Sequence, residues 1–419
     1  MDIGHAAGCS LFGGLRALAL AAMLVIASVP GHAAPGDFIH AEATHLVDAG
    51  GRLFAVKGIN LSNWLVPEGY MFKFTHALSP SDIAAVIEAL VGPQQAAQFW
   101  ARYREAYITQ ADIRFVKAAG FNTVRVPLDW RLFVETGDDG TDRFAGPGWA
   151  LLDRLVQWCR EAGLRVILDM HAAPGGQTGV NIDDSPGYPL TFYVPRYRRL
   201  TVGLWQKLAA HYRDEPAVLG YDLLNEPISP YSDEKYLNPR LDEFYRDIVA
   251  AVRSVDGNHI VFLEGAQWAT YFAVLGRPFD ANAVYTYHKF WSAPTRDAVQ
   301  SYLNYSRRWN VPLLIGETGE SSDAWNATFR KLHERLGVGW CFWPYKSLDS
   351  DTSAVSIAKP AGWEEIAAAG SIEAGALNAA SLPPRAQAQT ILNAYLDAVK
   401  FENVRVNSGY LNSLGLVTP

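Results

Sequence analysis

Two glutamates end apolar runs of the chain, where a charged side chain loses water unless something compensates for it. Glu226 closes "YDLLNEP" and Glu317 follows "LLIG". An ionised carboxylate at the edge of a core is costly. Pro227 stops the first run directly after Glu226, because proline has no N–H to continue a strand. These are either polar strand ends without a chemical role or carboxylates held in place for catalysis.

A pair of carboxylates on opposite sides of one opening is suited to cleaving a glycosidic bond. One carboxyl group protonates the leaving oxygen, and the other attacks the sugar or activates water. Arg125 near Glu317 would favour the ionised form that a nucleophile needs. Glu226 would stay protonated until it donates its proton and would then act as a base toward water. Asn225 offers an amide for a sugar 2-hydroxyl.

Eight short β-rich runs must position these groups. They alternate with amphipathic stretches such as "GWALLDRLVQWCREAG", where apolar residues recur three and four positions apart. Eight strand–helix units predict an α/β fold, a (β/α)8 TIM barrel, rather than a doubly wound sheet. We interpret residues 81–120 and 344–384 as loop insertions on this single domain. The runs are "LFAVKGINL", "NTVRVPL", "RVILDMH", "AVLGYDLLN", "HIVFLEG", "AVYTYHKF", "VPLLIGE" and "GVGWCFW".

The ends of six of these runs carry polar, titratable or aromatic side chains. A TIM barrel builds its active site at the C-terminal ends of its strands. Taken singly, such a residue has an ordinary explanation as a salt-bridge partner, a strand cap or a core residue. Six at one end of one barrel favour a functional site. In chain order they are Arg125, His171, Asn225 with Glu226, His288, Glu317 and Trp343.

Beyond this chemistry, the chain resembles glycoside hydrolase family 5, a large family of retaining enzymes that includes endoglucanases, mannanases and exo-1,3-glucanases. The resemblance is carried by "RVP", "DMHAAPG", "LNEP", "IGETG" and "FWPYK", in this order at strand ends. It implies that Glu226 is the acid/base and that Glu317, rather than Glu320, is the nucleophile. It also implies that Arg125, His171, Asn225, His288 and Trp343 surround the nucleophile and the first sugar.

The segments "KGINLSNW" and "DMHAAPGGQTG" are most similar to the exo-1,3-glucanase and β-glucosidase branch. The resemblance therefore implies a β-glucan or β-gluco-oligosaccharide substrate and a supporting role for Asn60 and Trp64. Exo action is favoured, with residues 62–75, 175–199 and 346–384 as candidate walls. An endo-acting β-1,4-glucanase or mannanase remains the alternative.

One position departs from the family pattern. Members of the family usually have a tyrosine two residues after the histidine of the sixth strand, and its hydroxyl touches the nucleophile. This chain has Phe290 there. Tyr285 and Tyr287 would face away, because strand side chains alternate. Glu317 then either lacks that hydrogen bond or receives one from elsewhere, for which Tyr345 is our candidate.

Composition excludes several other classes of protein. The 419 residues are 49% hydrophobic and carry a net charge of −7, so we expect no nucleic-acid partner, because neutralising phosphates requires a basic face.

The N-terminus predicts export. Arg16, an apolar stretch and "PGHAAPG" predict a signal peptide over residues 1–33, with an uncleaved anchor as the alternative. We expect a secreted or periplasmic monomer with its catalytic domain at 34–419, without a membrane partner after cleavage, although it could associate with the cell surface.

Two further function classes compete with the enzyme. A barrel that binds carbohydrate without cleaving it is possible, because a fold does not guarantee chemistry. A barrel acting on phosphorylated metabolites needs a phosphate cradle after its last strands, where "CFWPYKSLDS" offers aromatic residues instead. No spacing of Cys, His or acidic residues is typical of a metal site. We expect no metal and no cofactor, because the two carboxylates suffice.

Overall fold

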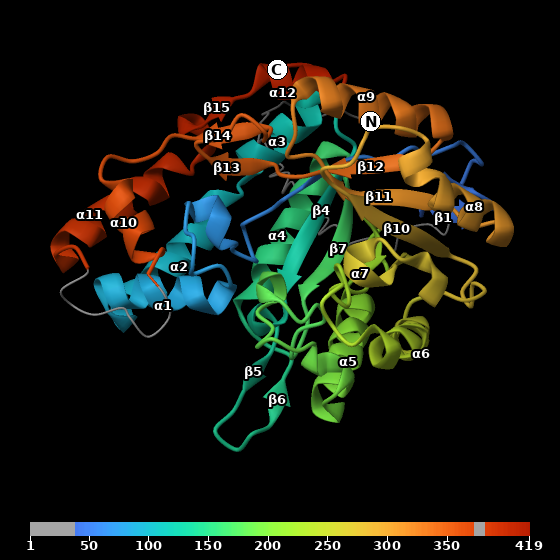
Figure 1. The fold of residues 1–419 in the computed structure, drawn as a ribbon, viewed down its shortest axis with the longest axis horizontal. Coiled ribbons are helices and arrows are strands. Elements are labelled where there is room, and N and C mark those ends of the chain that lie inside the picture. The colour runs from blue at the N-terminus through green and yellow to red at the C-terminus, as the bar shows by residue number, and fades with distance from the viewer. Residues whose placement is uncertain (1–37, 373–381) are drawn as a thin grey trace, which may run out of the picture. The chain divides into compact units, whose positions relative to one another are not determined.

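The strands at the centre of the fold close on themselves. The computed structural model describes residues 38–372 and 382–419, and within them eight parallel strands form a closed barrel in chain order, with the last strand paired to the first (Figure 1). This confirms the predicted (β/α)8 barrel. The strands are β3 (Lys57–Asn60), β4 (Thr123–Asp129), β7 (Arg165–Ala172), β8 (Val218–Asp222), β9 (Ile260–Glu264), β10 (Ala283–Lys289), β11 (Leu313–Thr318) and β12 (Gly339–Phe342).

Alternate residues of each barrel strand point into the barrel, and the rest pack against the helices. In β7, Val166 and Leu168 belong to the core shared with the helices, whereas Ile167 belongs to a second core inside the barrel. Because strand side chains alternate with a period of two, Asp169 and His171 share the inward face with Ile167. The inward faces are thus apolar near the start of the strands and polar near their C-terminal ends.

Helices cover the outside of the barrel, and their ends follow simple local rules. Thr109 and Asp112 form a capping box at the start of α3, which satisfies N–H groups that the helix leaves free. Gly163 and Gly337 end α4 and α9 in the left-handed conformation, which glycine adopts without a steric penalty. The helices are α1 (Pro80–Val91), α2 (Pro93–Tyr107), α3 (Gln110–Ala119), α4 (Pro147–Ala162), α5 (Pro195–Tyr212), α6 (Glu234–Arg253), α7 (Ala266–Ala269), α8 (Gln300–Trp309), α9 (Asp323–Leu336), α10 (Trp363–Ala369), α11 (Arg385–Ala398) and α12 (Ser408–Ser413).

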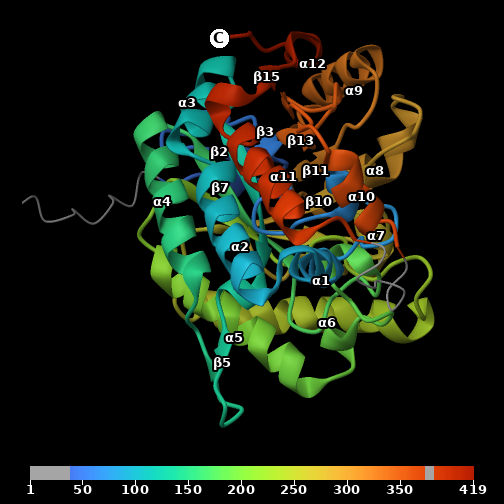
Figure 2. The same cartoon turned by 90° about the vertical axis from the view of Figure 1, so that its left-hand side faces the viewer.

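The two predicted insertions lie side by side. Helices α1 and α2 pack against α11, and α10 packs against α11 as well, as Figure 2 shows. Aromatic rings join them: the Trp363 and Tyr395 ring centroids are 4.4 Å apart, and Phe72 lies 5.7 Å from Tyr395. The insertions therefore form one helical layer beside the barrel with an aromatic core of its own.

A short hairpin outside the barrel covers one of its ends. β1 (His40–Glu42) and β2 (His45–Val47) form a hairpin, and Ile39 and Leu46 belong to the apolar core inside the barrel. The hairpin therefore covers the end opposite the polar one. The other short strands are β5 (Glu135–Thr136), paired with β6 (Asp142–Arg143), and the three-stranded sheet of β13 (Lys346–Leu348), β14 (Val355–Ile357) and β15 (Arg405–Val406).

Some sequence-based expectations concern residues that the structure does not describe. The predicted signal peptide, residues 1–33, lies outside the described residues. All the described residues fall in one compact unit, 33–419, and among them no helix has the length and apolar character needed to cross a membrane. Cys159 and Cys341 are both buried, and neither forms a disulfide.

Candidate active site

The C-terminal ends of the barrel strands surround a pocket of about 630 Å³. Strand order alone brings these ends together, because parallel strands of a closed barrel all end at the same rim. Of the residues predicted from the strand ends, six line this pocket: His171, Asn225, Glu226, His288, Glu317 and Trp343. The seventh, Arg125, lies buried among their neighbours.

Arg125 contacts more polar side chains of the site than any other described residue. Its side chain is inaccessible to solvent, and a buried guanidinium needs acceptors for its fixed fork of donors. Here acceptors from five other strands and their ends supply them. Arg125 donates to the side chains of Asn60, Asp222, Asn225, Glu264 and Glu317, and its Nη2 lies 3.1 Å from Asp169.

Glu317 lies between Arg125 and two histidines. The guanidinium Nη1 of Arg125 donates to Glu317 Oε1. The Nδ1 atoms of His288 and His171 lie 3.7 and 3.9 Å from its two oxygens. Burial raises the pKa of Glu317, and the positive charges of His288, Arg125 and His171 oppose that rise without cancelling it. Arg125 thus favours the charged form of Glu317, as the sequence suggested, but burial keeps the pKa above its ordinary value.

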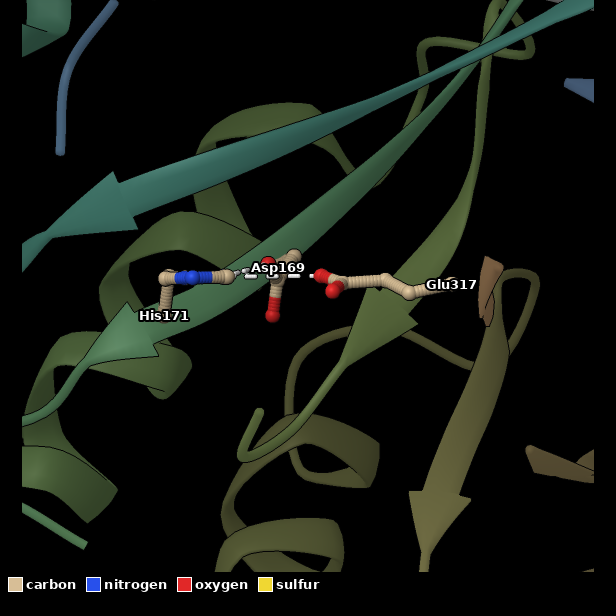
Figure 3. A group of neighbouring side chains, drawn as sticks. All are labelled: Asp169, His171 and Glu317. Carbon is tan, nitrogen blue, oxygen red and sulfur yellow. Dashed lines mark hydrogen bonds and ion pairs between the residues drawn. The ribbon is translucent and has the colours of Figure 1, made fainter. Parts of the chain in front are cut away.

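His171 is held by a carboxylate that the strand-end survey passed over. Its Nδ1 donates to Asp169 Oδ2 at 2.8 Å, and the same nitrogen faces Glu317 from across the barrel (Figure 3). The ring also stacks on Trp343, with centroids 5.7 Å apart and planes within 7°. Burial lowers the pKa of His171, but the charges of Asp169, Glu317 and Glu68 outweigh it and raise the value to about 9. His171 is thus a cation beside Glu317 at neutral pH.

His288 contacts the side chain of Glu226, and Glu264 contacts its backbone. His288 Nδ1 lies 2.9 Å from Glu226 Oε1, and its Nε2 lies 3.1 Å from Glu264 Oε1. The other oxygen of Glu264 accepts the backbone N–H of Glu226 at 2.6 Å. Glu226 has a φ of 48°, which costs a non-glycine residue on the order of 1 kcal/mol and requires support from its surroundings. Glu264 supplies part of that support.

The two candidate catalytic carboxylates lie close together. One oxygen of Glu226, one of Glu317 and a nitrogen of His288 all lie within 4.8 Å of one another. Asp169, His171 and Glu317 form a second group of the same kind. Each group contains a histidine whose pKa the neighbouring carboxylates raise.

Three predicted supporting residues lie outside the pocket. Asn60 donates to the carbonyls of Gly316 and Phe342 and accepts from Arg125, so it touches the site only through Arg125. The indole of Trp64 donates to the carbonyl of Arg104, within the helical layer. The hydroxyl of Tyr345 donates to Asp112 Oδ1 at 2.9 Å.

The expectation that Tyr345 could reach Glu317 is therefore wrong. Tyr345 follows Pro344 and its hydroxyl is committed to Asp112 beneath the helical layer. Phe290, which stands at the usual tyrosine position, does line the pocket. The hydroxyl of Tyr285 donates to the carbonyl of Gly276, and that of Tyr287 pairs with His333. Both side chains therefore face away from Glu317, as the alternation of strand side chains predicted. No tyrosine hydroxyl in the described part of the chain is recorded within hydrogen-bonding distance of Glu317.

Several acidic residues of the site were missed from sequence. Glu264 ends the fifth strand in "VFLEG", and a survey of all eight strand ends would have found it. Asp169 lies three residues before the end of β7 and Asp222 is the last residue of β8, both on the inward face, so alternation could have found them. Glu68 and Tyr70 fall within the expected wall 62–75, where nothing in the local sequence singles them out, and Glu320 was weighed only as the alternative to Glu317.

Comparisons with known proteins show which family the chain belongs to. The cellulase family, glycosyl hydrolase family 5, matches residues 88–349. A β-xylosidase of Phanerodontia chrysosporium is 31% identical over 241 residues, 57% of this chain and 48% of that protein. A probable glucan endo-1,6-β-glucosidase B of Aspergillus flavus is 25% identical over 70% of this chain and 84% of that protein. The chain spans about half the length of the first curated relatives it matches.

Solved structures share the fold at low sequence identity. The rutinosidase of Aspergillus niger superposes with a TM-score of 0.58 at 18% identity, over 72% of this chain and 92% of that one. An endogalactoceramidase has the same TM-score at 17% identity, over 91% of this chain and 86% of that one. Since the family match extends over more than half of the chain, this protein belongs to glycosyl hydrolase family 5.

Proposed function

We propose that this protein is a retaining β-glycosidase that acts by double displacement, with Glu226 as the acid/base and Glu317 as the nucleophile. The observation that carries the proposal is the short separation of these two carboxylates, whose nearest oxygens lie within 4.8 Å. Retaining enzymes hold their carboxyl groups about 5–5.5 Å apart, whereas inverting enzymes leave about 6.5–9.5 Å for a water molecule.

Each step of the reaction has a group positioned for it. Glu317 attacks the anomeric carbon while Glu226 gives its proton to the leaving oxygen, so the bond to the aglycone breaks and a glycosyl ester forms. Glu226 then removes a proton from water, which attacks the same carbon and releases Glu317. Arg125, His171 and His288 place three cationic groups against the carboxylate that departs in this second step.

Asn225 is oriented for the sugar 2-hydroxyl. Its Oδ1 accepts from Arg125 Nη2 at 2.9 Å, which fixes the amide so that its NH₂ faces away from the guanidinium. That Nδ2 is buried and has no hydrogen-bond partner among the described residues. A buried donor without a partner is costly, and a bound hydroxyl would satisfy it.

For the sugar, we favour a terminal β-glucosyl unit removed by exo action from β-glucans, β-gluco-oligosaccharides or related glucosides. Curated relatives include probable glucan 1,3-β-glucosidases as well as endoglucanases. Two of the expected walls contribute to the pocket, with Glu68, Gly69 and Tyr70 from one and residues 180–182 from the other. The described parts of the third, 346–372 and 382–384, do not line it.

The experiment that tests the chemistry is active-site trapping. A 2-deoxy-2-fluoro-β-glucosyl fluoride slows both steps but lets the ester accumulate, so intact-mass measurement should show one added fluoroglycosyl group and peptide mapping should place it on Glu317. A label on Glu320, or binding without any label, would contradict the assignment. The exo prediction fails if long β-glucans are cut at random while short oligosaccharides remain intact.

The remaining proposals concern the protein in the cell. We propose export after cleavage of residues 1–33, with residues 34–419 acting as one catalytic domain and as a monomer. The apolar segment that ends before "PGHAAPG" supports export. N-terminal sequencing of the protein recovered from its natural host, together with its mass in solution, tests these statements.

A further inference from the structure

The pocket walls differ in character on the two sides of the catalytic pair. Strands β11, β12 and β3 are neighbours in the barrel, as are β8, β9 and β10. From the first group and its loops come Glu317, Glu320, Tyr70 and Glu68, whose polar side chains suit sugar hydroxyls. The loops after the second group contribute the rings of Tyr231, Trp268, Phe290 and Trp291, here called the aromatic wall.

The aromatic wall lies on the side of the proton donor. Tyr231 follows Glu226 by five residues on the same loop, and Trp291 follows His288, the partner of Glu226, by three. In the proposed mechanism Glu226 protonates the oxygen between the sugar and the leaving group, so the leaving group extends toward Glu226. The aromatic wall therefore surrounds the leaving group, whereas the polar side holds the sugar.

The aromatic wall is built in two pairs. The rings of Tyr231 and Trp268 meet edge to face with centroids 5.5 Å apart, and those of Phe290 and Trp291 are also 5.5 Å apart. Trp268 and Trp291 have φ values of 56° and 48°, which side chains other than glycine rarely adopt. Strained backbone that holds a half-buried ring and an exposed ring in a pocket wall is consistent with a binding role.

Polar groups on this wall are few. Besides the phenol of Tyr231 and the indole N–H groups of Trp268 and Trp291, this side of the pocket offers Thr270 and Lys289. A second sugar carries several hydroxyls, which would lose water here without enough partners. Tyr231 and Trp291 are 82% and 81% exposed, and such exposed rings gain most by covering apolar surface.

We propose that the aromatic wall binds an apolar leaving group, so that the preferred substrates are β-glycosides of aromatic or long-chain alcohols rather than oligosaccharides. This inference rests on the proposed glycosidase function and narrows its substrate class. It places the selection of substrate in the loops after β8, β9 and β10, while the polar half of the pocket selects the sugar.

The test compares leaving groups of equal chemical reactivity. Octyl and methyl β-glucosides have alcohols of similar acidity, so a difference in kcat/KM reports binding of the chain. We expect octyl β-glucoside to exceed methyl β-glucoside and cellobiose by at least about 100-fold. Equal values, or a preference for the disaccharide, would overturn the proposal.

Variants of the exposed rings locate the effect. Trp291→Ala and Tyr231→Ala should each lower kcat/KM for octyl β-glucoside by at least about tenfold and for methyl β-glucoside by less than about threefold. Tyr236→Ala, a tyrosine 38% exposed on α6 and outside the pocket, should change neither. Equal losses on both glucosides would place the rings in the sugar site and contradict the proposal.

A substrate without an aglycone separates this inference from the function on which it rests. Hydrolysis of β-glucosyl fluoride requires the catalytic pair but has only fluoride as its leaving group. Turnover of the fluoride without a preference for octyl over methyl glucoside would overturn the aglycone site alone. Failure to hydrolyse the fluoride would overturn the proposed function.

Discussion

Glu264 accepts the backbone N–H of Glu226 at 2.6 Å, so the proposed proton donor is fixed through its main chain as well as through its side chain. The same carboxylate accepts from Arg125 and lies beside His288. One buried residue of β9 thus connects the acid/base side of the site with the cluster around the nucleophile.

Replacing Glu264 should disturb proton donation more than folding. Glu264 faces three donors: Arg125, His288 and the backbone N–H of Glu226. In Glu264→Gln, one of them must face the new NH₂ group, and the resulting repulsion shifts Glu226 from its position for proton donation. We expect kcat to fall by about 10- to 100-fold, with a larger loss on glycosides of poor leaving groups than on those of good ones. A purely structural role would lower the melting temperature and leave this dependence on the leaving group unchanged.

The control for this variant is Glu243→Gln, at a 68% exposed glutamate on α6 that pairs with Arg198. It should leave both kcat and the leaving-group dependence as in the wild type. Steady-state kinetics on a series of substituted phenyl β-glucosides, with thermal unfolding of each variant, provides the measurement.

The two catalytic carboxylates should respond differently to the leaving group. Glu226→Ala removes general acid catalysis, worth about 10²- to 10⁴-fold, on alkyl glucosides. A dinitrophenyl glucoside needs no proton to depart and should still form its glycosyl ester. Glu317→Ala should abolish turnover of both. If the two variants lost similar amounts of activity on both substrates, the assigned roles would be contradicted.

Glu68 should make stability depend on pH. Burial raises the pKa of Glu68 to about 8, and the negative charges of Glu317, Glu320 and Glu226 add to the effect. Between its ordinary value and this one, the folded protein binds more protons than the unfolded chain, so the free energy of unfolding falls as pH rises.

Glu68→Gln removes this dependence. Relative to the variant, the wild type should lose up to about 1.4 kcal/mol of stability for each pH unit across that window. Denaturant unfolding at pH 5, 6.5 and 8 measures the difference. A constant difference between the two proteins over this range would show that Glu68 does not titrate there.

Phe290→Tyr should place a hydroxyl near the position that family members use beside the nucleophile. A hydrogen bond to the charged form of Glu317 would lower its pKa, so the low-pH limb of kcat/KM should move down by about one unit. Phe290→Leu, which loses the ring without gaining a hydroxyl, should leave that limb in place. Identical profiles for the Tyr and Leu variants would show that the new hydroxyl does not reach Glu317.

The barrel was predictable because its signals are local and repeated. Each strand is a short apolar run, each is separated from the next by a helical pattern, and Glu226 and Glu317 then fall at strand ends by counting alone. His171 and His288 were found in the same way. Arg125, expected at a strand end, lies instead in the middle of β4. The closed topology in chain order adds what residue patterns cannot give by themselves, namely which strand ends are neighbours.

The parts that were not predictable depend on tertiary contacts. Tyr345 and Trp64 are aromatic residues next to site segments, yet the helical layer takes up their polar groups. Glu68 and Tyr70 reach the pocket only because the β3–α1 loop folds over the rim. Burial raises the pKa of Glu317 and three nearby cations lower it. Which effect is larger depends on distances that the sequence does not contain.

The aromatic wall remains in place after the leaving group has departed. In the second half of the proposed reaction it then faces the glycosyl ester, and Glu226 is ready to deprotonate whichever hydroxyl lies there. An alcohol with an apolar tail occupies that position in preference to water. Wall loops of this composition would make the protein a catalyst for building alkyl glycosides as well as for cleaving them, with the ratio of transfer to hydrolysis rising with the length of the acceptor's chain.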